Sequence, residues 1–538
     1  MVQILIADHK AIDWVQKDGN YFRGWFFKDN NYYENENTLY FFDSISDNEF
    51  SNRLNNINGN YACIYESNDK TYVAVDRIRS FPLFYTNFKG EVYISDNIEK
   101  LAEITSSTKF EINHVQELMA TGYVTGIKTL YKNIYQLQAG EYLIIHNETG
   151  YIERHNHYLH SHSYDCNKSS TELCEELDLV LLDVFKRLVR SVNGKPIVLF
   201  LSGGYDSRLV AVMLKRLSYE NVYCISFGKK NNKEVIAAED VAETLGLNWE
   251  LITFPQDYFR NMLDNHKFVE YIKNTVNGVC TPYYQGILAE EFIKRGLIPE
   301  DSIIVTGNSG DLLEGDQFNP NFVEGQTYTK DEIIDAIINS HYMIFGKDFS
   351  KKKVFRKYVS ESIEDIQNKD VYTYEECHDI LEFFNWRERQ SKYVVNDARC
   401  YDEFLGNEWR LPLWDSEFMD FWLKVPIELR KDRKLYYEYI KEERFLTANN
   451  PTIYQKTMNY MKDKAMFIIE LFYPLRKLMN FCFGESPFYT VSLKEYLKIL
   501  RITKGYMINT ITTHIYMELT QIYKNKISSI DEIITSND

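Results

Sequence analysis

The stretch Pro196-Ile-Val-Leu-Phe-Leu-Ser-Gly-Gly-Tyr-Asp-Ser-Arg-Leu-Val-Ala-Val-Met-Leu214 decides how the rest of the chain is interpreted. Residues 197–201 form a short apolar run, which is typical of a strand inside a parallel sheet. After residue 208 the apolar residues recur at helical spacing. The pattern therefore predicts a buried strand, a glycine turn at residues 202–207, and a helix.

The side chains of this turn suit phosphate binding. Gly203 and Gly204 let the backbone approach a polyphosphate closely, and the helix that follows offers unpaired N–H groups. Ser202 and Ser207 add hydroxyl donors. Asp206 would repel a phosphate unless a divalent cation lay between them, which predicts ATP bridged by Mg²⁺. The alternative is an ordinary glycine turn in which Asp206 caps the helix.

Residues 202–207 resemble the SGGxDS pyrophosphate loop of the N-type ATP pyrophosphatases, and of the asparagine synthetase and β-lactam synthetase family in particular. The resemblance implies an α/β enzyme with a doubly wound parallel sheet. Such an enzyme adenylates a carboxylate, releases pyrophosphate and then forms an amide, with ATP and Mg²⁺ as cofactors. The next apolar strand ends in Ser226, Phe227 and Gly228, where the resemblance places the adenosine.

A second segment, Ile303-Ile-Val-Thr-Gly-Asn-Ser-Gly-Asp-Leu-Leu-Glu314, repeats this order of apolar strand, small residues and acid. It is similar to the family's second phosphate loop, SGxGxDxxxxG, so the resemblance implies that Gly307, Ser309 and Gly310 contact pyrophosphate. Asp311 would then be the second magnesium ligand beside Asp206. Taken alone, the segment is equally typical of a turn. Asn308 stands where family members carry Glu or Tyr and cannot act as a base.

Two further segments resemble this family. Asn407-Glu-Trp-Arg-Leu-Pro-Leu-Trp-Asp415 is similar to its Glu-x-Arg-x-Pro segment, in which the acid and the arginine fix a helix over the site. A buried structural ion pair is the alternative there. In Leu429-Arg-Lys-Asp-Arg-Lys-Leu-Tyr436 the resemblance assigns a catalytic role to Lys434, which would neutralise charge during adenylation and acyl transfer. Without the resemblance, Lys434 reads as a solvated surface residue.

The first 152 residues are rich in short β-type runs separated by turns. From Asn60 to Leu101 they resemble the glutaminase domain of class II amidotransferases, an Ntn-hydrolase-like α+β sandwich. In a working glutaminase the nucleophile is a cysteine that follows Met1, but here that residue is Val2. Cys63, the one cysteine of this region, lies in an apolar run where a packed thiol is expected. We therefore expect a domain without glutaminase activity.

The resemblance and the composition together predict four regions. These are a degenerate glutaminase-like domain at 1–152, a linker at 153–171, an ATP-binding domain at 172–449, and additional helices at 450–538. The linker contains four histidines at spacings that can bind a metal, namely His155, His157, His160 and His162. Because no paired cysteines accompany them, a polar linker is the favoured interpretation.

Composition narrows the function classes. The 538 residues include 78 acidic and 61 basic ones, which argues against a nucleic-acid or anionic membrane surface. Eight scattered cysteines without a CxxC pair, and the lack of a signal peptide or apolar span, lead us to expect a cytoplasmic protein with reduced thiols. No sequence feature identifies its oligomeric state, and either a homodimer or an association with another enzyme of the pathway is compatible with it.

The sequence thus predicts an AMP-forming carbon–nitrogen ligase that joins a small-molecule or peptide carboxylate to ammonia or a substrate amine. Its nearest relatives by resemblance are asparagine synthetases, lasso peptide cyclases, β-lactam-forming enzymes, and amidating enzymes of polysaccharide or natural-product pathways. An ordinary glutamine-dependent asparagine synthetase is one alternative. A tRNA sulfur-transfer enzyme and a non-catalytic binding protein are the others; the intact Asp206 and Asp311 speak against the last.

Overall fold

A computed structural model describes residues 2–43, 45–46, 49–163, 166–228, 230–253, 271, 277–281, 291–315, 318–344 and 352–441. The predicted helical region 450–538 lies outside these residues, and so do residues 442–449 of the predicted ATP-binding domain.

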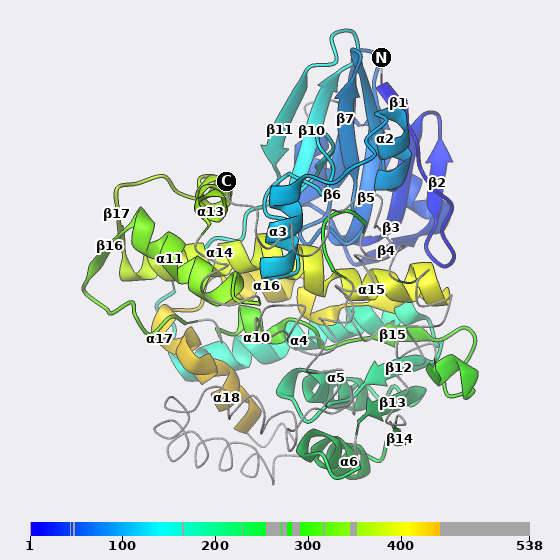
Figure 1. Ribbon diagram of the computed structural model, residues 1–538. Helices are drawn as coiled ribbons and strands as arrows, with labels where there is room; N and C mark the ends of the chain where they lie inside the picture. The colour runs from blue at the N-terminus through cyan, green and yellow to red at the C-terminus, as the bar shows by residue number, and fades with distance from the viewer. Residues whose placement is uncertain are drawn as a thin grey trace, which may run out of the picture.

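Two packed sheets form the N-terminal domain (Figure 1). The larger sheet has the order β11-β10-β6-β5-β3-β2, with β4 also paired to β3, and every pairing is antiparallel. Its strands are β2 (Trp14–Lys17), β3 (Asn20–Lys28), β4 (Asn31–Glu34), β5 (Asn58–Glu66), β6 (Lys70–Val75), β10 (Glu141–His146) and β11 (Ile152–Asn156). The smaller sheet has the order β1-β8-β7-β9, from β1 (Val2–Ile4), β8 (Glu91–Ser95), β7 (Phe84–Phe88) and β9 (Tyr135–Gln136).

The core of this domain follows from the alternation of side chains along β5. Ala62 and Ile64 face the second sheet and join its Val92 and Ile94 in one buried cluster. Cys63 faces the opposite side, where it packs with Phe22 and other aromatic residues below the helix α1 (Phe50–Asn55). The predicted sandwich is confirmed. Strand β11 reaches Asn156, past the domain boundary predicted at residue 152.

The second domain contains a five-stranded parallel sheet with the order β14-β13-β12-β15-β18. Its strands are β12 (Ile197–Phe200), β13 (Val222–Phe227), β14 (Asn248–Ile252), β15 (Ile303–Val305) and β18 (Trp409–Arg410). The chain runs outward from β12 to β14 and then returns to the other side of β12. Strand order therefore reverses between β12 and β15, which is where open α/β sheets form their ligand crevice. The predicted doubly wound parallel sheet is confirmed.

Helices pack around this sheet, and some of them lie between it and the sandwich. A capping box at Ser169 and Glu172 begins α4 (Ser170–Val192), and α5 (Tyr205–Arg216) and α6 (Lys233–Leu245) connect the first three strands. Figure 1 shows α15 (Asn396–Cys400) and α16 (Ser416–Trp422) lying between the sandwich above and the parallel sheet below. The remaining helices include α10 (Gly310–Leu313), α11 (Lys330–His341), α13 (Lys353–Ile363), α14 (Tyr374–Phe384), α17 (Ile427–Arg430) and α18 (Lys434–Lys441).

Buried charges join the two domains. Arg23 of β3 donates to Asp402 at 2.7 Å, and both side chains are almost completely buried. At the edge strand β18, the guanidinium of Arg410 lies 4.1 Å from the centre of the Trp25 ring and pairs with Glu408 at 3.0 Å. Arg410 is buried where the two domains meet, and its partner Glu408 is partly exposed. We did not predict β18 as a strand.

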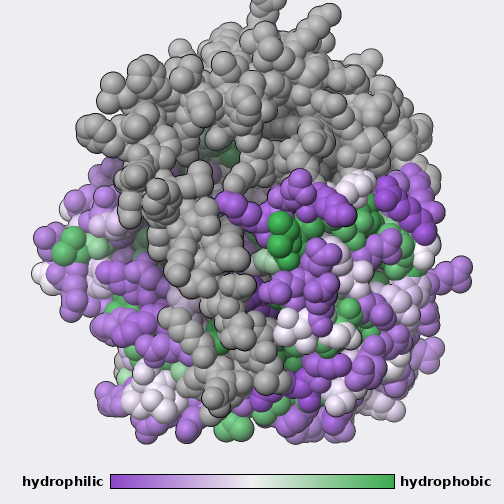
Figure 2. Space-filling view, turned by 90° about the horizontal axis from the view of Figure 1, so that it is seen from below, coloured by the Kyte–Doolittle hydropathy of each residue, from purple (hydrophilic) through white to green (hydrophobic). Residues whose placement is uncertain are grey.

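The described part of one face of the molecule is mostly polar. On the described part of the face seen from below, hydrophilic residues surround small separated apolar areas (Figure 2). Within the described residues, no helix has the length and apolar character needed to span a bilayer.

Candidate functional site: two loops at the carboxyl ends of the parallel strands

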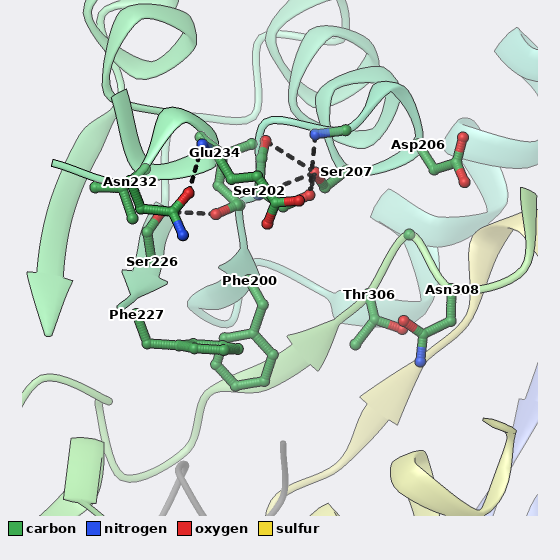
Figure 3. A pocket seen from close by; sticks show the side chains of 14 residues that line it. Phe200, Ser202, Asp206, Ser207, Ser226, Phe227, Asn232, Glu234, Thr306 and Asn308 are labelled. Carbon is green, nitrogen blue, oxygen red and sulfur yellow. Dashed lines mark hydrogen bonds between the residues drawn. The ribbon is translucent and has the colours of Figure 1, made fainter. Parts of the chain in front are cut away.

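A cavity of about 230 Å³ lies where the strand order reverses. Figure 3 shows hydroxyl groups of the first predicted loop on one side, the rings of Phe200 and Phe227 on another, and Thr306 and Asn308 on a third. The cavity is lined by Phe200, Leu201, Ser202, Gly204, Asp206, Ser207, Ser226, Phe227, Asn232, Glu234, Val235, Thr306, Gly307 and Asn308. It therefore combines an aromatic wall with a wall of hydroxyl and amide groups.

The first loop is held by its own serines. The backbone N–H of Ser202 donates to Ser207 Oγ at 3.1 Å, and the N–H of Gly204 donates to Ser202 Oγ at 3.2 Å. Helix α5 begins at Tyr205 with Gly204 as its N-cap, so the positive end of the helix dipole meets the cavity. Gly203 packs on α6, where an added Cβ would lie 3.0 Å from Glu234 Cα. This geometry favours an anion.

The second loop touches the first directly. A Cβ on Gly307 would lie 2.7 Å from the backbone of Asp206 and Ser207, and one on Gly310 would lie 2.9 Å from the Asp206 carboxyl carbon. Both positions therefore require glycine. The backbone N–H of Asp311 donates to Asp206 Oδ2 at 3.2 Å, which brings the two predicted magnesium ligands together.

A third carboxyl group and a guanidinium complete the cluster. Arg433 donates to Asp206 Oδ1 at 2.7 Å and also pairs with the fully buried Glu314. Burial raises the pKa of Asp206 to about 6; Arg433 opposes the rise and the charge of Asp311 adds to it. Burial and the charge of Asp206 hold the pKa of Glu314 well above its usual range. Glu314 Oε1 is buried and has no hydrogen-bond partner among the described residues.

The cation at this cluster is Arg433, whereas the sequence pointed to Lys434. The Lys434 side chain is exposed and does not line the cavity. Asp432 and Arg433 have positive φ angles of 54° and 58°, so the backbone turns sharply before α18 and directs the side chain of residue 433 inward. Arg433 is therefore the cation of this carboxylate cluster, and the catalytic role of Lys434 in adenylation and acyl transfer stays a prediction.

Other predicted residues support the cavity without lining it. The hydroxyl of Ser309, a residue with φ of 72°, donates to Gln390 at 2.6 Å, away from the first loop. The N–H of Gly228 donates to Ile252 at 3.0 Å and so continues the sheet. Gly203 and Gly310 provide the close packing described above. Of the predicted residues, those that line the cavity are Ser202, Gly204, Asp206, Ser207, Ser226, Phe227 and Gly307.

The sequence reasoning did not identify Asn232 and Glu234, at the start of α6, as residues of the cavity. Asn232 caps this helix by accepting from the N–H of Glu234 at 2.8 Å, and both residues line the cavity. An Asn two residues before an acid is a recognisable helix start, so this signal was present in the sequence. Thr306 Oγ1 and Asn308 Nδ2 are buried without hydrogen-bond partners among the described residues, which leaves both groups available to a ligand.

Comparisons with known proteins divide the chain in the same way. Residues 48–158 match the family model of a glutamine amidotransferase domain, and residues 180–285 match that of asparagine synthase. A search of curated proteins gives no match.

Three solved structures have low similarity to the chain. The NH3-dependent NAD synthetase from Campylobacter jejuni, in complex with nitrate, shares 19% identity over 27% of this chain and 60% of its own, with a TM-score of 0.18. The glutamine phosphoribosylpyrophosphate amidotransferase from B. subtilis shares 12% identity over 55% of this chain and 64% of its own, with a TM-score of 0.18. The NAD+ synthetase from Burkholderia pseudomallei shares 12% identity over 40% of this chain and 84% of its own, again with a TM-score of 0.18.

The chain thus spans less than two thirds of the Campylobacter structure. The two family models lie in the order amidotransferase, then synthase, and each falls on one of the two domains of the fold. A glutamine amidotransferase domain followed by an asparagine synthase domain is the architecture of the asparagine synthetase family, and this chain has that architecture.

Proposed function

We propose that this protein is an ATP-dependent amide ligase that adenylates a substrate carboxylate, releases pyrophosphate, and transfers the acyl group to ammonia or a substrate amine. The direct contact between two glycine loops at the switch point carries the proposal. Because Gly307 and Gly310 pack closely against Asp206, the two loops are adjacent, which supports their binding one ligand together. That ligand is anionic, since the start of α5 and the serine hydroxyls face it.

The carboxylates fit Mg²⁺. Hard oxygen ligands are what this ion binds, and Asp206 and Asp311 would hold it. Burial is the main cause of the raised pKa of Asp206, and a bound cation would favour its charged form; the unpartnered Glu314 Oε1 is a further oxygen beside it. When bound, the ion would neutralise the phosphate charge beside these carboxylates. Arg433 would remain the protein's own cation at this point.

The chain's residues would then position the reactants. The loop N–H groups and the hydroxyls of Ser202 and Ser207 would bind phosphate oxygens, and Phe200 and Phe227 would pack against the base. Holding ATP and a carboxylate in line removes the entropic cost of bringing them together, and fixed positive groups stabilise charge that develops on the transferring phosphate.

We further propose that the nitrogen does not come from glutamine hydrolysed by the N-terminal domain. Val2 packs against the hydrophobic core in β1, and Cys63 is completely buried among aromatic residues. Burial raises the pKa of the Cys63 thiol far above its usual value, so it forms no thiolate nucleophile near neutral pH.

Nucleotide binding and product identity test the main proposal. Calorimetry with ATP should show one site in the presence of Mg²⁺ and much weaker binding in EDTA. Asp206→Asn should abolish the magnesium-dependent part, whereas the exposed Asp301→Asn should retain it. In a screen of carboxylates and amines, turnover should yield AMP and pyrophosphate. ADP as the product, or ATP binding indifferent to Mg²⁺, would contradict the proposal.

A further inference from the structure

Two of the four linker histidines meet a glutamate that is distant in sequence. His160 Nε2 lies 2.9 Å and His162 Nε2 lies 2.8 Å from Glu382 Oε1, in the last turn of α14. All three residues are buried, and they form a group with the spacing of metal ligands. His155 and His157 point elsewhere: His155 is near Glu153, and His157 Nε2 contacts the carbonyl of Val75 at 2.9 Å.

From this geometry we propose that His160, His162 and Glu382 bind a zinc ion that fastens the segment between the two domains to α14. Two imidazole nitrogens and one carboxylate oxygen are a ligand set that zinc uses. In a tetrahedral site with zinc–ligand bonds near 2.0–2.1 Å, ligand atoms lie about 3.3 Å apart. The two distances from the imidazole nitrogens to Glu382 Oε1 are within roughly half an ångström of that value, and all three ligand atoms lie within 4.8 Å of one another.

The surroundings have the form expected around metal ligands. The second nitrogen of His160, Nδ1, lies 3.1 Å from the Tyr158 hydroxyl. This hydroxyl can accept a hydrogen bond from Nδ1–H in the tautomer whose Nε2 lone pair can bind a metal. Arg430 engages Glu382 Oε2 and leaves Oε1 directed at both imidazoles. Such outer contacts fix the orientation of ligands before the metal arrives.

The backbone of the histidine segment is held as well. Asp379, on α14, accepts from the N–H of His162 and from the hydroxyl of Ser161, each at 2.9 Å. The Trp386 ring stacks on His160 with 5.8 Å between ring centres. The segment is thus positioned by contacts other than the three ligands, so a metal would find them already assembled.

A fourth nitrogen is available on the same helix. His378 precedes Glu382 by one turn of α14 and therefore lies on the same face. Its Nε2 is buried and has no hydrogen-bond partner among the described residues. It is not part of the close group, so it would need to move to complete a tetrahedral site.

The competing explanation is a pair of N–H···O hydrogen bonds to Glu382 without a metal, and metal analysis separates the two. The full chain is purified without a histidine tag and dialysed briefly against a weak chelator. We expect about one zinc per chain in the wild type and in His155→Gln, and a loss of at least tenfold in His162→Gln. Circular dichroism verifies that the variants fold.

A second measurement uses only the wild type, so its result does not depend on whether a variant folds. The metal-free protein is titrated with Co²⁺, and the visible absorption of a tetrahedral nitrogen and oxygen site should saturate at one equivalent and disappear on adding Zn²⁺. A wild type with neither zinc nor saturable Co²⁺ binding would overturn the proposal. So would a folded His162→Gln that retained its zinc. ATP binding is not part of either readout, so failure here leaves the proposed ligase function standing.

Discussion

The raised pKa of Asp206 predicts that this residue destabilises the protein when no magnesium nucleotide is bound. Asp206→Asn should therefore stabilise the free protein near neutral pH, although it removes a proposed metal ligand. The side chain is 18% exposed and lies within a cluster of two other carboxyl groups and one guanidinium. An amide has nearly the same shape and carries no charge.

The magnitude follows from the pKa. Asp206 rises from 3.8 to about 6 in the folded protein. One unit of pKa corresponds to about 1.4 kcal/mol, so ionising Asp206 in the folded state costs about 3 kcal/mol more than in the unfolded chain. Because the folded pKa is the higher one, the stabilisation by the bound proton is complete below about pH 4 and is lost as the pH rises through about 6.

The assay is chemical denaturation of the wild type and Asp206→Asn between pH 4 and pH 7.5 in EDTA. The variant should gain up to about 3 kcal/mol over the wild type above pH 6.5, and this difference should shrink toward pH 4. Asp301→Asn, an exposed substitution in the same domain, should show no such dependence on pH. Mg²⁺ with ATP should then stabilise the wild type and leave Asp206→Asn unchanged.

A difference that stayed constant with pH would refute the reasoning, because a constant offset points to altered packing and not to titration. A variant less stable than the wild type at pH 7 would also refute it, since the attraction between Asp206 and Arg433 would then outweigh the cost of burial.

Three further predictions concern individual residues. Arg433→Ala should lower the rate of AMP formation about 100-fold, because it removes the cation beside Asp206. Lys434→Ala should change this rate less than twofold. Equal effects of the two substitutions in steady-state kinetics would contradict this prediction and support a catalytic role for Lys434. Gly307→Ala should destabilise the protein by about 1–3 kcal/mol through the clash with Asp206, and Gly204→Ala, which would meet only the Ser202 hydroxyl at 3.2 Å, should cost less in the same denaturation assay. With glutamine as the nitrogen source, the wild type should release no glutamate above background, and enzyme-dependent release blocked by a glutamine-directed alkylating analogue would show that the N-terminal domain is active.

Much of the fold could be predicted from the sequence because the deciding signals are local. The run at 197–201, the two glycines and the apolar spacing after residue 208 are all contiguous, and together they specify strand, turn and helix. The strands of the first domain could be predicted as well, because their alternation of side chains is also a local signal. In contrast, β18 has two residues, and only its pairing with β15 makes it a strand.

The parts of the site that escaped prediction depend on distant contacts or on unusual backbone angles. A family pattern points to Lys434, whereas the residue beside the carboxylates is Arg433, which follows a turn with positive φ that the sequence does not reveal. Likewise, the spacing of His160 and His162 was visible in the sequence, whereas Glu382 lies about 220 positions away and has no local signal. Such a partner becomes evident only when the fold brings α14 beside the histidine segment.

The buried pair of Arg23 and Asp402 limits how the two domains of this chain can evolve separately. Each domain supplies one member of a charge pair that is buried where the two domains meet, so replacing either member with an uncharged residue leaves the other ion buried without this partner, at a cost of about 3–5 kcal/mol. Natural selection for the stability of the second domain therefore also constrains Arg23 in the first, whether or not the first domain retains any chemistry. Recombination that exchanged one domain between relatives would keep this ion pair only where the incoming domain carried the matching residue.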